Sequence, residues 1–211
     1  MAAMDEQLIR RHDGLALLFA PPFDRTPLDP GYIKGYPPGL RENGGQYTHA
    51  AIWSVIAYAL QGEGERAAEL FAMVNPVNHA LSLADAHRYK VEPYAVAADI
   101  YAAPSHVGRG GWTWYTGSAG WMYRAGLEYI LGLHREGTAL RIEPCIPRSW
   151  PGYEIRLRHG AARYVVTVEN PAGARTGIGH AWLDGVEVVE RPVRVVLADD
   201  GGEHAVRLVL G

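Results

Sequence analysis

The sequence has little cysteine, no long apolar run and no strong excess of either charge. Cys145 is the single cysteine among 211 residues, so an internal disulfide is excluded and a reducing compartment is favoured. No apolar run approaches the roughly 20 residues that cross a bilayer. The N-terminal MAAMDEQLIRRHDG also has no apolar stretch behind its charges that could serve as a signal peptide. These absences predict a soluble, cytoplasmic protein.

The charge balance and the missing motifs exclude further classes. With 20 Lys and Arg against 23 Asp and Glu, the formal net charge is −3, so the basic field that binds nucleic acid is absent. The nine histidines form neither H-E-x-x-H nor a cluster with cysteine, which gives a metal site no support. GEGER lacks the third glycine of a dinucleotide fingerprint. We therefore expect neither a metal nor an organic cofactor.

Two hydrophobic periods divide the chain near residue 140. Before this point, YTHAAIWSVIAYALQ, GERAAELFAMV and GSAGWMYRAGLEYILGLHR repeat apolar residues at helical spacing, and long loops rich in Gly and Pro join them. After it, segments such as YEIRLRH, ARYVVTVEN and HAVRLVL alternate apolar and polar residues. The pattern predicts an α+β fold, with helices in residues 1–139 and an antiparallel β-sandwich in residues 140–211.

One candidate site lies where the Gly-rich segment GYIKGYPPGLRENGGQ gives way to a helix near Tyr47 or Thr48. His49 then falls in the first helical turn. Amides in that turn have no intrahelical acceptor and carry partial positive charge, which favours an anion. The alternative is that Thr48 caps the helix while His49 packs or lies on the surface.

A second helix start has the same character. Thr116 is a candidate N-cap, and Gly117 and Ser118 offer first-turn amides that a ligand can approach closely. Ser118 itself lacks the G-x-S-x-G context of a nucleophile elbow. We therefore interpret this segment as a second anion-ready helix start.

Aromatic and acidic side chains surround this segment in the sequence. Trp112 and Trp114 are one residue apart, so in an extended strand both indoles face one side, either as a sugar platform or as core. Glu92, Tyr94 and Asp99 lie close together in KVEPYAVAADIY, where carboxylates can serve acid–base chemistry or bind hydroxyls. Glu92 can instead have a structural role at a helix start.

Three long segments carry a family resemblance. GYIKGYPPGLRENGGQYTHAAIW, YKVEPYAVAADIY and GRGGWTWYTGSAGWMYRAGLEYILGL, followed by LRIEPCIPRSWPGYEIRLRH, resemble the C-terminal part of glycoside hydrolase family 94. These are inverting β-glucoside phosphorylases, and the likeness is strongest to the cyclic β-1,2-glucan synthases within the family. It runs from about Leu15 to about Pro171. It implies that residues 1–139 are the last part of an (α/α)6 catalytic barrel and residues 140–211 the C-terminal β-sandwich.

The resemblance also implies site residues and a reaction. The family cleaves a β-glucosidic bond with inorganic phosphate as co-substrate, giving α-glucose 1-phosphate. By resemblance, the phosphate site consists of His49, Thr116 and Gly117. The sugar-binding residues that the resemblance implies are Arg41, Glu92, Tyr94, Trp112 and Trp114.

One part of the family's machinery is missing. The general acid of the family is an aspartate in an Asp-Trp-Asn-Asp-Gly motif upstream, and this motif does not occur in the chain. The resemblance therefore implies a C-terminal fragment of a phosphorylase, which binds β-glucan and phosphate weakly and is inactive alone. Part of a barrel leaves apolar helix faces exposed, so we expect self-association or pairing with the missing N-terminal portion.

Two alternatives belong to other functional classes. A carbohydrate-binding module would use Trp112 and Trp114 as a platform and would bind sugar without phosphate. A stand-alone inverting hydrolase would pair Glu92 with Glu42 or Asp99, at about 6.5 to 9.5 Å.

Overall fold

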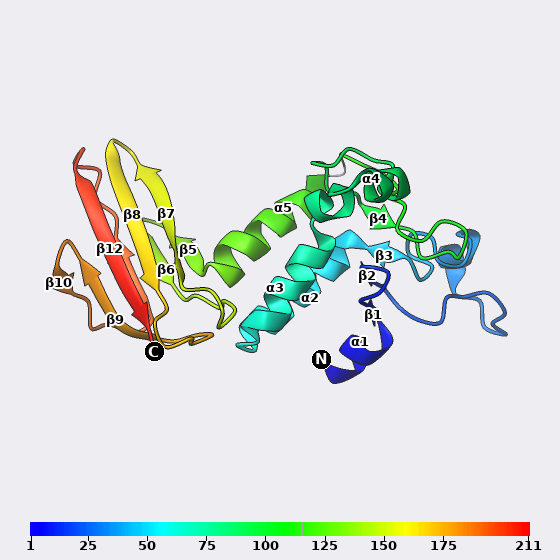
Figure 1. Cartoon of the computed structure of the whole chain (residues 1–211), viewed down its shortest axis with the longest axis horizontal. Coiled ribbons are helices and arrows are strands. Elements are labelled where there is room, and N and C mark those ends of the chain that lie inside the picture. Colours follow the sequence, from blue (N-terminus) through cyan, green and yellow to red (C-terminus); the bar gives the residue numbers. More distant parts are fainter. Residues whose placement is uncertain (115) are drawn as a thin grey trace. The chain divides into compact units, whose positions relative to one another are not determined.

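The computed structural model describes residues 1–114 and 116–211, without the side chain of residue 116. Backbone contacts group the chain into two compact units, Met1–Val55 with Glu69–Ala125 and Ile56–Ala68 with Gly126–Gly211. The mixture of helices and sheets agrees with the α+β class (Figure 1). The predicted division of the chain at residue 140, into part of a barrel and a sandwich, stays a prediction. Within the described ranges, no helix has the length and apolarity needed to cross a membrane.

Helices dominate the first part of the chain, as the 3.6-residue period predicts. The α-helices are α1 Ala2–Gln7, α2 Thr48–Leu60, α3 Gly64–Val74, α4 Leu83–Tyr89 and α5 Thr116–Arg124, and a π-helix, Ala125–Ile130, continues α5. Two short 3₁₀ helices, η1 Gly31–Gly35 and η2 Pro76–Ala80, lie in the connections. The helix starts predicted near Thr48 and at Thr116 are confirmed.

Short strands hold the long loops of the first unit together. β1 Ile9–Arg10 pairs with β2 Leu15–Ala16, and β3 Gln46–Tyr47 pairs with β4 Asp99–Ile100. Tyr47 lies opposite Asp99 in this ladder, and Ile100 forms a further bridge with Gly110. Residues distant in the sequence therefore meet immediately before α2 begins.

Two sheets make up most of the second unit, which also includes Ile56–Ala68. The three-stranded sheet has the order β11-β6-β5 and is antiparallel, with β5 Leu133–Glu136, β6 Ala139–Ile142 and β11 Val193–Val196. The five-stranded sheet has the order β10-β9-β12-β8-β7, with β7 Gly152–His159, β8 Ala162–Glu169, β9 Ile178–Leu183, β10 Val186–Glu187 and β12 Glu203–Leu210. Alternate residues of β8, β11 and β12 are buried, which gives each sheet one core face.

The five-stranded sheet differs from the predicted antiparallel arrangement in one pair of strands. β12 runs parallel to β8, with Val206 opposite Val166, and antiparallel to β9. The last strand therefore inserts between two earlier ones, which makes the sheet mixed. A period of two gives the same burial pattern in either strand direction, so the sequence does not reveal this pairing.

His204, at the start of the central strand β12, contacts two loops and gives a prediction about pH. Its Nδ1 lies 2.7 Å from Asp184 Oδ2, and its Nε2 lies 3.2 Å from Asp200 Oδ1. The hydrogen bond with Asp184, followed by the one with Asp200, raises the pKa of His204 above 6.5. The stabilisation is therefore fully present below pH 6.5 and is lost as pH rises through the raised pKa. We expect urea unfolding of His204→Gln to lose this pH dependence, and an unchanged pH profile in the variant would contradict the linkage.

Candidate functional site

The two predicted anion-binding helix starts meet in the first unit. A Cβ built on Gly117, in the first turn of α5, would lie 3.9 Å from His49 Nδ1 and 4.0 Å from its Cε1. The imidazole at the start of α2 therefore packs directly against the backbone at the start of α5. The side chain of Thr116 lies outside the described residues, so its predicted contact with phosphate stays a prediction.

His49 has a polar atom that lacks a partner. Its Nε2 is buried and makes no hydrogen bond within the described residues. The ring packs edge-on against Trp53, at 4.8 Å between centroids, and lies 6.0 Å from Trp121. This packing agrees in part with the alternative of a packed histidine. A buried nitrogen without a partner is uncommon in folded proteins, however, and indicates a place for a further hydrogen-bonding group.

Arg41 lies over the face of Trp112. Its guanidinium carbon is 4.3 Å from the Trp112 ring centroid and 5.5 Å from that of Tyr36. Arg41 Nε lies 3.5 Å from Glu42 Oε2, so the two charges attract each other, yet both atoms are buried and neither has a hydrogen-bond partner among the residues described. The pair can therefore still donate to and accept from a ligand.

Asp99 lies close to Arg41 and Glu42 and was not among the predicted binding residues. Its side chain is buried, its Oδ1 accepts a hydrogen bond from the Trp112 amide at 3.2 Å, and its Oδ2 has no partner in the part of the chain that the structure describes. Burial raises the pKa of Asp99, and the nearby positive charge of Arg41 opposes that rise. A Cβ on Gly111 would lie 2.3 Å from Asp99 Oδ1, so the close approach requires glycine. The one signal in the sequence was an acid within an otherwise apolar segment.

A further cluster of contacting side chains consists of Glu92, Tyr94 and Trp114. The Trp114 indole N–H donates to Glu92 Oε1 at 2.9 Å, and the Tyr94 and Trp114 rings are 6.3 Å apart at 66°. The hydrogen bond from Trp114 lowers the pKa of Glu92, which keeps this carboxylate ionised. Trp114 has φ of 59°, an unfavourable conformation for a bulky residue and one that occurs at functional sites.

The two tryptophans, Trp112 and Trp114, lie in different surroundings. Trp112 is 59% exposed and Trp114 is 67% exposed, so the alternative that they fill the core of this unit is wrong. Their expected common orientation assumed an extended segment, and the positive φ of Trp114 interrupts it. Trp112 instead contacts Arg41, whereas Trp114 contacts Glu92 and Tyr94.

The arrangement combines two kinds of binding group. Helix-start amides and His49 suit an oxyanion, while Arg41, Glu42 and Asp99 provide donors and acceptors beside exposed indole faces. The strand pairing of Tyr47 with Asp99 brings the two kinds of group together, because Tyr47 immediately precedes α2, which carries His49. The arrangement can bind an anion together with a hydroxyl-rich ligand that has an apolar face.

Several known proteins are similar to this chain in sequence. Residues 1–132 match the catalytic domain of the glycosyl hydrolase 94 superfamily. The chain is 54% identical over 168 residues to the cyclic β-(1,2)-glucan synthase NdvB of Rhizobium meliloti, covering 80% of this chain and 6% of the relative. It is 32% identical to an N,N'-diacetylchitobiose phosphorylase of Vibrio proteolyticus, covering 100% of this chain and 26% of the relative. A solabiose phosphorylase of Paenibacillus borealis is 30% identical, with coverages of 89% and 24%.

The chain thus spans about a quarter or less of the length of these relatives. The match nevertheless includes the segments that contain His49, Asp99 and Gly117, the residues around which the site is built. It also covers more than half of the chain, since it extends over residues 1–132 of 211. The chain belongs to the glycosyl hydrolase 94 superfamily.

Proposed function

We propose that this chain forms the phosphate-binding wall and part of the sugar-binding surface of an inverting β-glucoside phosphorylase site. Its helices would be the last part of an (α/α)6 barrel, and its two sheets the C-terminal sandwich. The general acid would lie upstream, because the Asp-Trp-Asn-Asp-Gly motif is absent from the chain. A β-1,2-glucan is the substrate that the 54% identity to a cyclic β-(1,2)-glucan synthase favours.

The observation that carries the proposal is the approach of Gly117 to His49. A helix start that faces an imidazole nitrogen without a partner among the described residues offers several donors to one oxyanion. Such donors orient phosphate for nucleophilic attack. His49 and the Gly117 amide would thus hold phosphate in position for attack on the anomeric carbon.

The remaining groups fit a pyranose beside that phosphate. Arg41 and Glu42 would bind hydroxyls, since one offers donors and the other acceptors, and the exposed Trp112 would contact the apolar sugar face. In the whole enzyme, an acid outside this chain would protonate the glycosidic oxygen while phosphate attacks from the opposite face. This displacement inverts the anomeric carbon.

The first test is calorimetric titration of the chain with inorganic phosphate. We expect His49→Ala to weaken binding at least tenfold, which corresponds to about 1.4 kcal/mol, because the variant removes a donor from the oxyanion. His12→Ala is the matched control, since its side chain is 80% exposed and lies outside the proposed site. Equal phosphate affinity in His49→Ala and the unaltered chain would contradict the proposed role.

The second test is turnover. With phosphate and a β-1,2-linked gluco-oligosaccharide, the isolated chain should release no glucose 1-phosphate, because it lacks the general acid. Robust turnover by this chain would show that the acid lies within it and would overturn the proposed division of the site. A purified N-terminal portion of a relative, added in trans, provides the positive arm.

One further candidate function has an observation in its favour. The exposure of Trp112 and Trp114 also suits a carbohydrate-binding module. Such a module would bind gluco-oligosaccharide equally well with and without phosphate, whereas the phosphorylase site predicts mutual dependence. The alternative of a stand-alone inverting hydrolase stays a prediction, because the lowered pKa of Glu92 suits the general base of such a pair and the raised pKa of Asp99 suits the general acid.

A further inference from the structure

A basic hollow lies in the first unit, between the end of α4 and the loop 103–109. Its wall consists mainly of side chains that carry or can take up a positive charge, and all of these are exposed to solvent. They are His87, Arg88, Lys90, His106 and Arg109, with Ser105 beside them. Among the described residues, no acidic side chain lines the hollow, and none of the candidate-site residues does. The hollow is therefore a separate, accessible place of positive charge.

Backbone contacts hold the two sides of the hollow against each other. The Gly110 amide donates to the carbonyl of Tyr89, the last residue of α4, at 2.9 Å. The Gly108 backbone approaches the stem of Arg88 so closely that a Cβ there would lie 2.8 Å from Arg88 Cδ. Lys90 follows α4 with φ of 58°, a position that glycine usually occupies. The fold itself therefore brings the basic side chains together.

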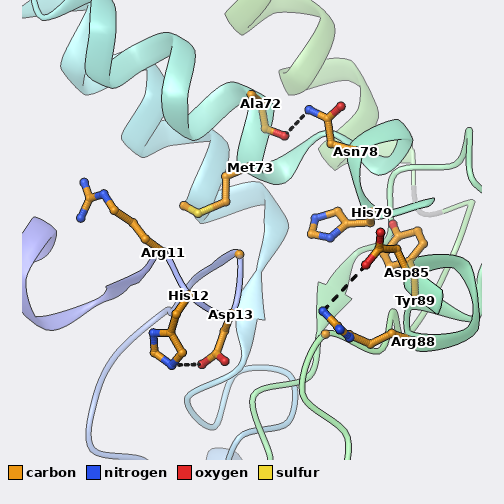
Figure 2. A pocket seen from close by; sticks show the side chains of 12 residues that line it. Arg11, His12, Asp13, Ala72, Met73, Asn78, His79, Asp85, Arg88 and Tyr89 are labelled. Carbon is orange, nitrogen blue, oxygen red and sulfur yellow. Dashed lines mark hydrogen bonds and ion pairs between the residues drawn. The ribbon is translucent and has the colours of Figure 1, made fainter. Parts of the chain in front are cut away.

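The positive charges of the hollow are only partly balanced. Arg88 Nη1 lies 4.0 Å from Asp85 Oδ1, the ion pair drawn in Figure 2. Lys90 and Arg109 form no ion pair within the described part of the chain. The whole chain has a net charge of −3, so this cluster opposes the overall charge. Like charges that lie close together repel each other, and an anion between them removes that repulsion.

The dipole of α4 accounts for only part of this cluster. Cations in the last turn of a helix are stabilised by its partial negative end, which gives His87 and Arg88 a structural role. His106 and Arg109 belong to a different segment, and that role does not extend to them. A guanidinium and an ammonium that reach one hollow from two segments form a donor set typical of phosphate sites.

We propose that this hollow binds the phosphate group of a small soluble ligand. The Arg109 guanidinium donates to two phosphate oxygens, and the Lys90 ammonium adds a third contact. Arg88 remains shared with Asp85. A doubly charged phosphate suits the hollow better than a singly charged anion, because three cations face it and one carboxylate opposes them. The proposal does not depend on the phosphate site at His49.

Nuclear magnetic resonance of backbone amides tests this site in the unaltered chain and in His49→Ala, which lacks the competing site. Titration with inorganic pyrophosphate at low ionic strength should shift the amide signals of Lys90 and of residues 105–109 saturably in both chains. We expect Arg109→Gln to weaken the affinity about tenfold or more, because a hydrogen bond between charged groups is lost. Arg158→Gln is the matched control, since it removes the same charge from an exposed position on β7.

Lys90→Gly separates binding from folding. Glycine suits the left-handed backbone at this position, so the variant removes the ammonium without lowering stability. Pyrophosphate affinity should fall in Lys90→Gly, while the midpoint of urea unfolding stays the same or rises. Because the amide shifts are also measured in the unaltered chain, the test does not depend on the folding of any variant.

Several results would overturn the proposal. One is the absence of saturable shifts at Lys90 and residues 105–109, and another is unchanged affinity in both Arg109→Gln and Lys90→Gly. Equal weakening in Arg158→Gln would show that only the overall charge matters. Loss of these shifts in His49→Ala would assign the anion to the candidate site. Vesicles of phosphatidylglycerol form a separate arm, and binding to them without any response to pyrophosphate would replace the soluble ligand with a membrane surface.

Discussion

Replacing Gly132 with alanine is expected to lower the free energy of unfolding by roughly 2 to 5 kcal/mol, the sum of left-handed strain and overpacking. Gly132 has φ of 73°, and a Cβ there would lie 2.2 Å from the carbonyl carbon and oxygen of Glu143. These are backbone atoms, and the Glu143 amide also donates to the Gly132 carbonyl at 2.8 Å. The added methyl group must therefore displace the chain rather than a flexible side chain.

Gly137→Ala is the control for the Gly132 prediction. Gly137 has φ of 62°, yet no atom of the described residues lies within 4 Å of the position that its Cβ would take, so the variant carries the same backbone strain without the clash. Its expected loss is about 1 to 2 kcal/mol. Urea unfolding followed by circular dichroism measures both variants. Equal losses of unfolding free energy in the two variants would show that a clash with the Glu143 backbone adds nothing to the cost of the Gly132 substitution.

The second large effect is expected at the candidate site, from Gly111→Ala. The new Cβ would lie 2.3 Å from Asp99 Oδ1, so the buried carboxylate must move. That movement breaks its hydrogen bond with the Trp112 amide and disturbs the position of Arg41 over Trp112. We expect about 2 kcal/mol of lost stability from the unsatisfied buried groups. Sugar binding should weaken at least tenfold, measured by tryptophan fluorescence during titration with a β-1,2-linked gluco-oligosaccharide.

Gly35→Ala serves as the comparison for Gly111→Ala. Within the described ranges, no atom lies within 4 Å of a Cβ at Gly35, and the φ of Gly35 is not in the left-handed region. Stability and sugar binding should therefore both remain near those of the unaltered chain. If Gly111→Ala behaved like Gly35→Ala, the buried carboxylate of Asp99 would not control the position of Arg41. Phosphate titration of the same variants separates a local change at Asp99 from general unfolding of the unit.

The sequence predicted those features that depend on neighbouring residues. The starts of α2 at Thr48 and α5 at Thr116 follow from N-cap residues, small residues and an apolar 3.6-residue period, all within one or two turns. The strands of the second unit likewise follow from alternation. The first of them, β5, begins at Leu133, earlier than expected, because Gly132 interrupts the helical path there.

Other features depended on which strands and loops pair. The parallel alignment of β12 with β8 leaves no trace in a period of two. The exposure of Trp112 and Trp114 was also undecided, because two tryptophans at this spacing suit a core and a binding surface equally well. The sequence indicated only that Asp99 lies near Glu92 and Tyr94 along the chain. Its contact with the Trp112 amide depends on the ladder between β3 and β4.

By itself, the sequence determined the class of fold, the two helix starts and the family, since each is encoded in contiguous segments. Only the tertiary structure decided that Gly117 packs against His49. The same is true of Asp99, which lies close to Arg41 and accepts a hydrogen bond from the Trp112 amide. The physical reason is that caps and periodicity act over a few residues, whereas these sites form when distant loops come together, and that pairing is set by packing of the whole unit.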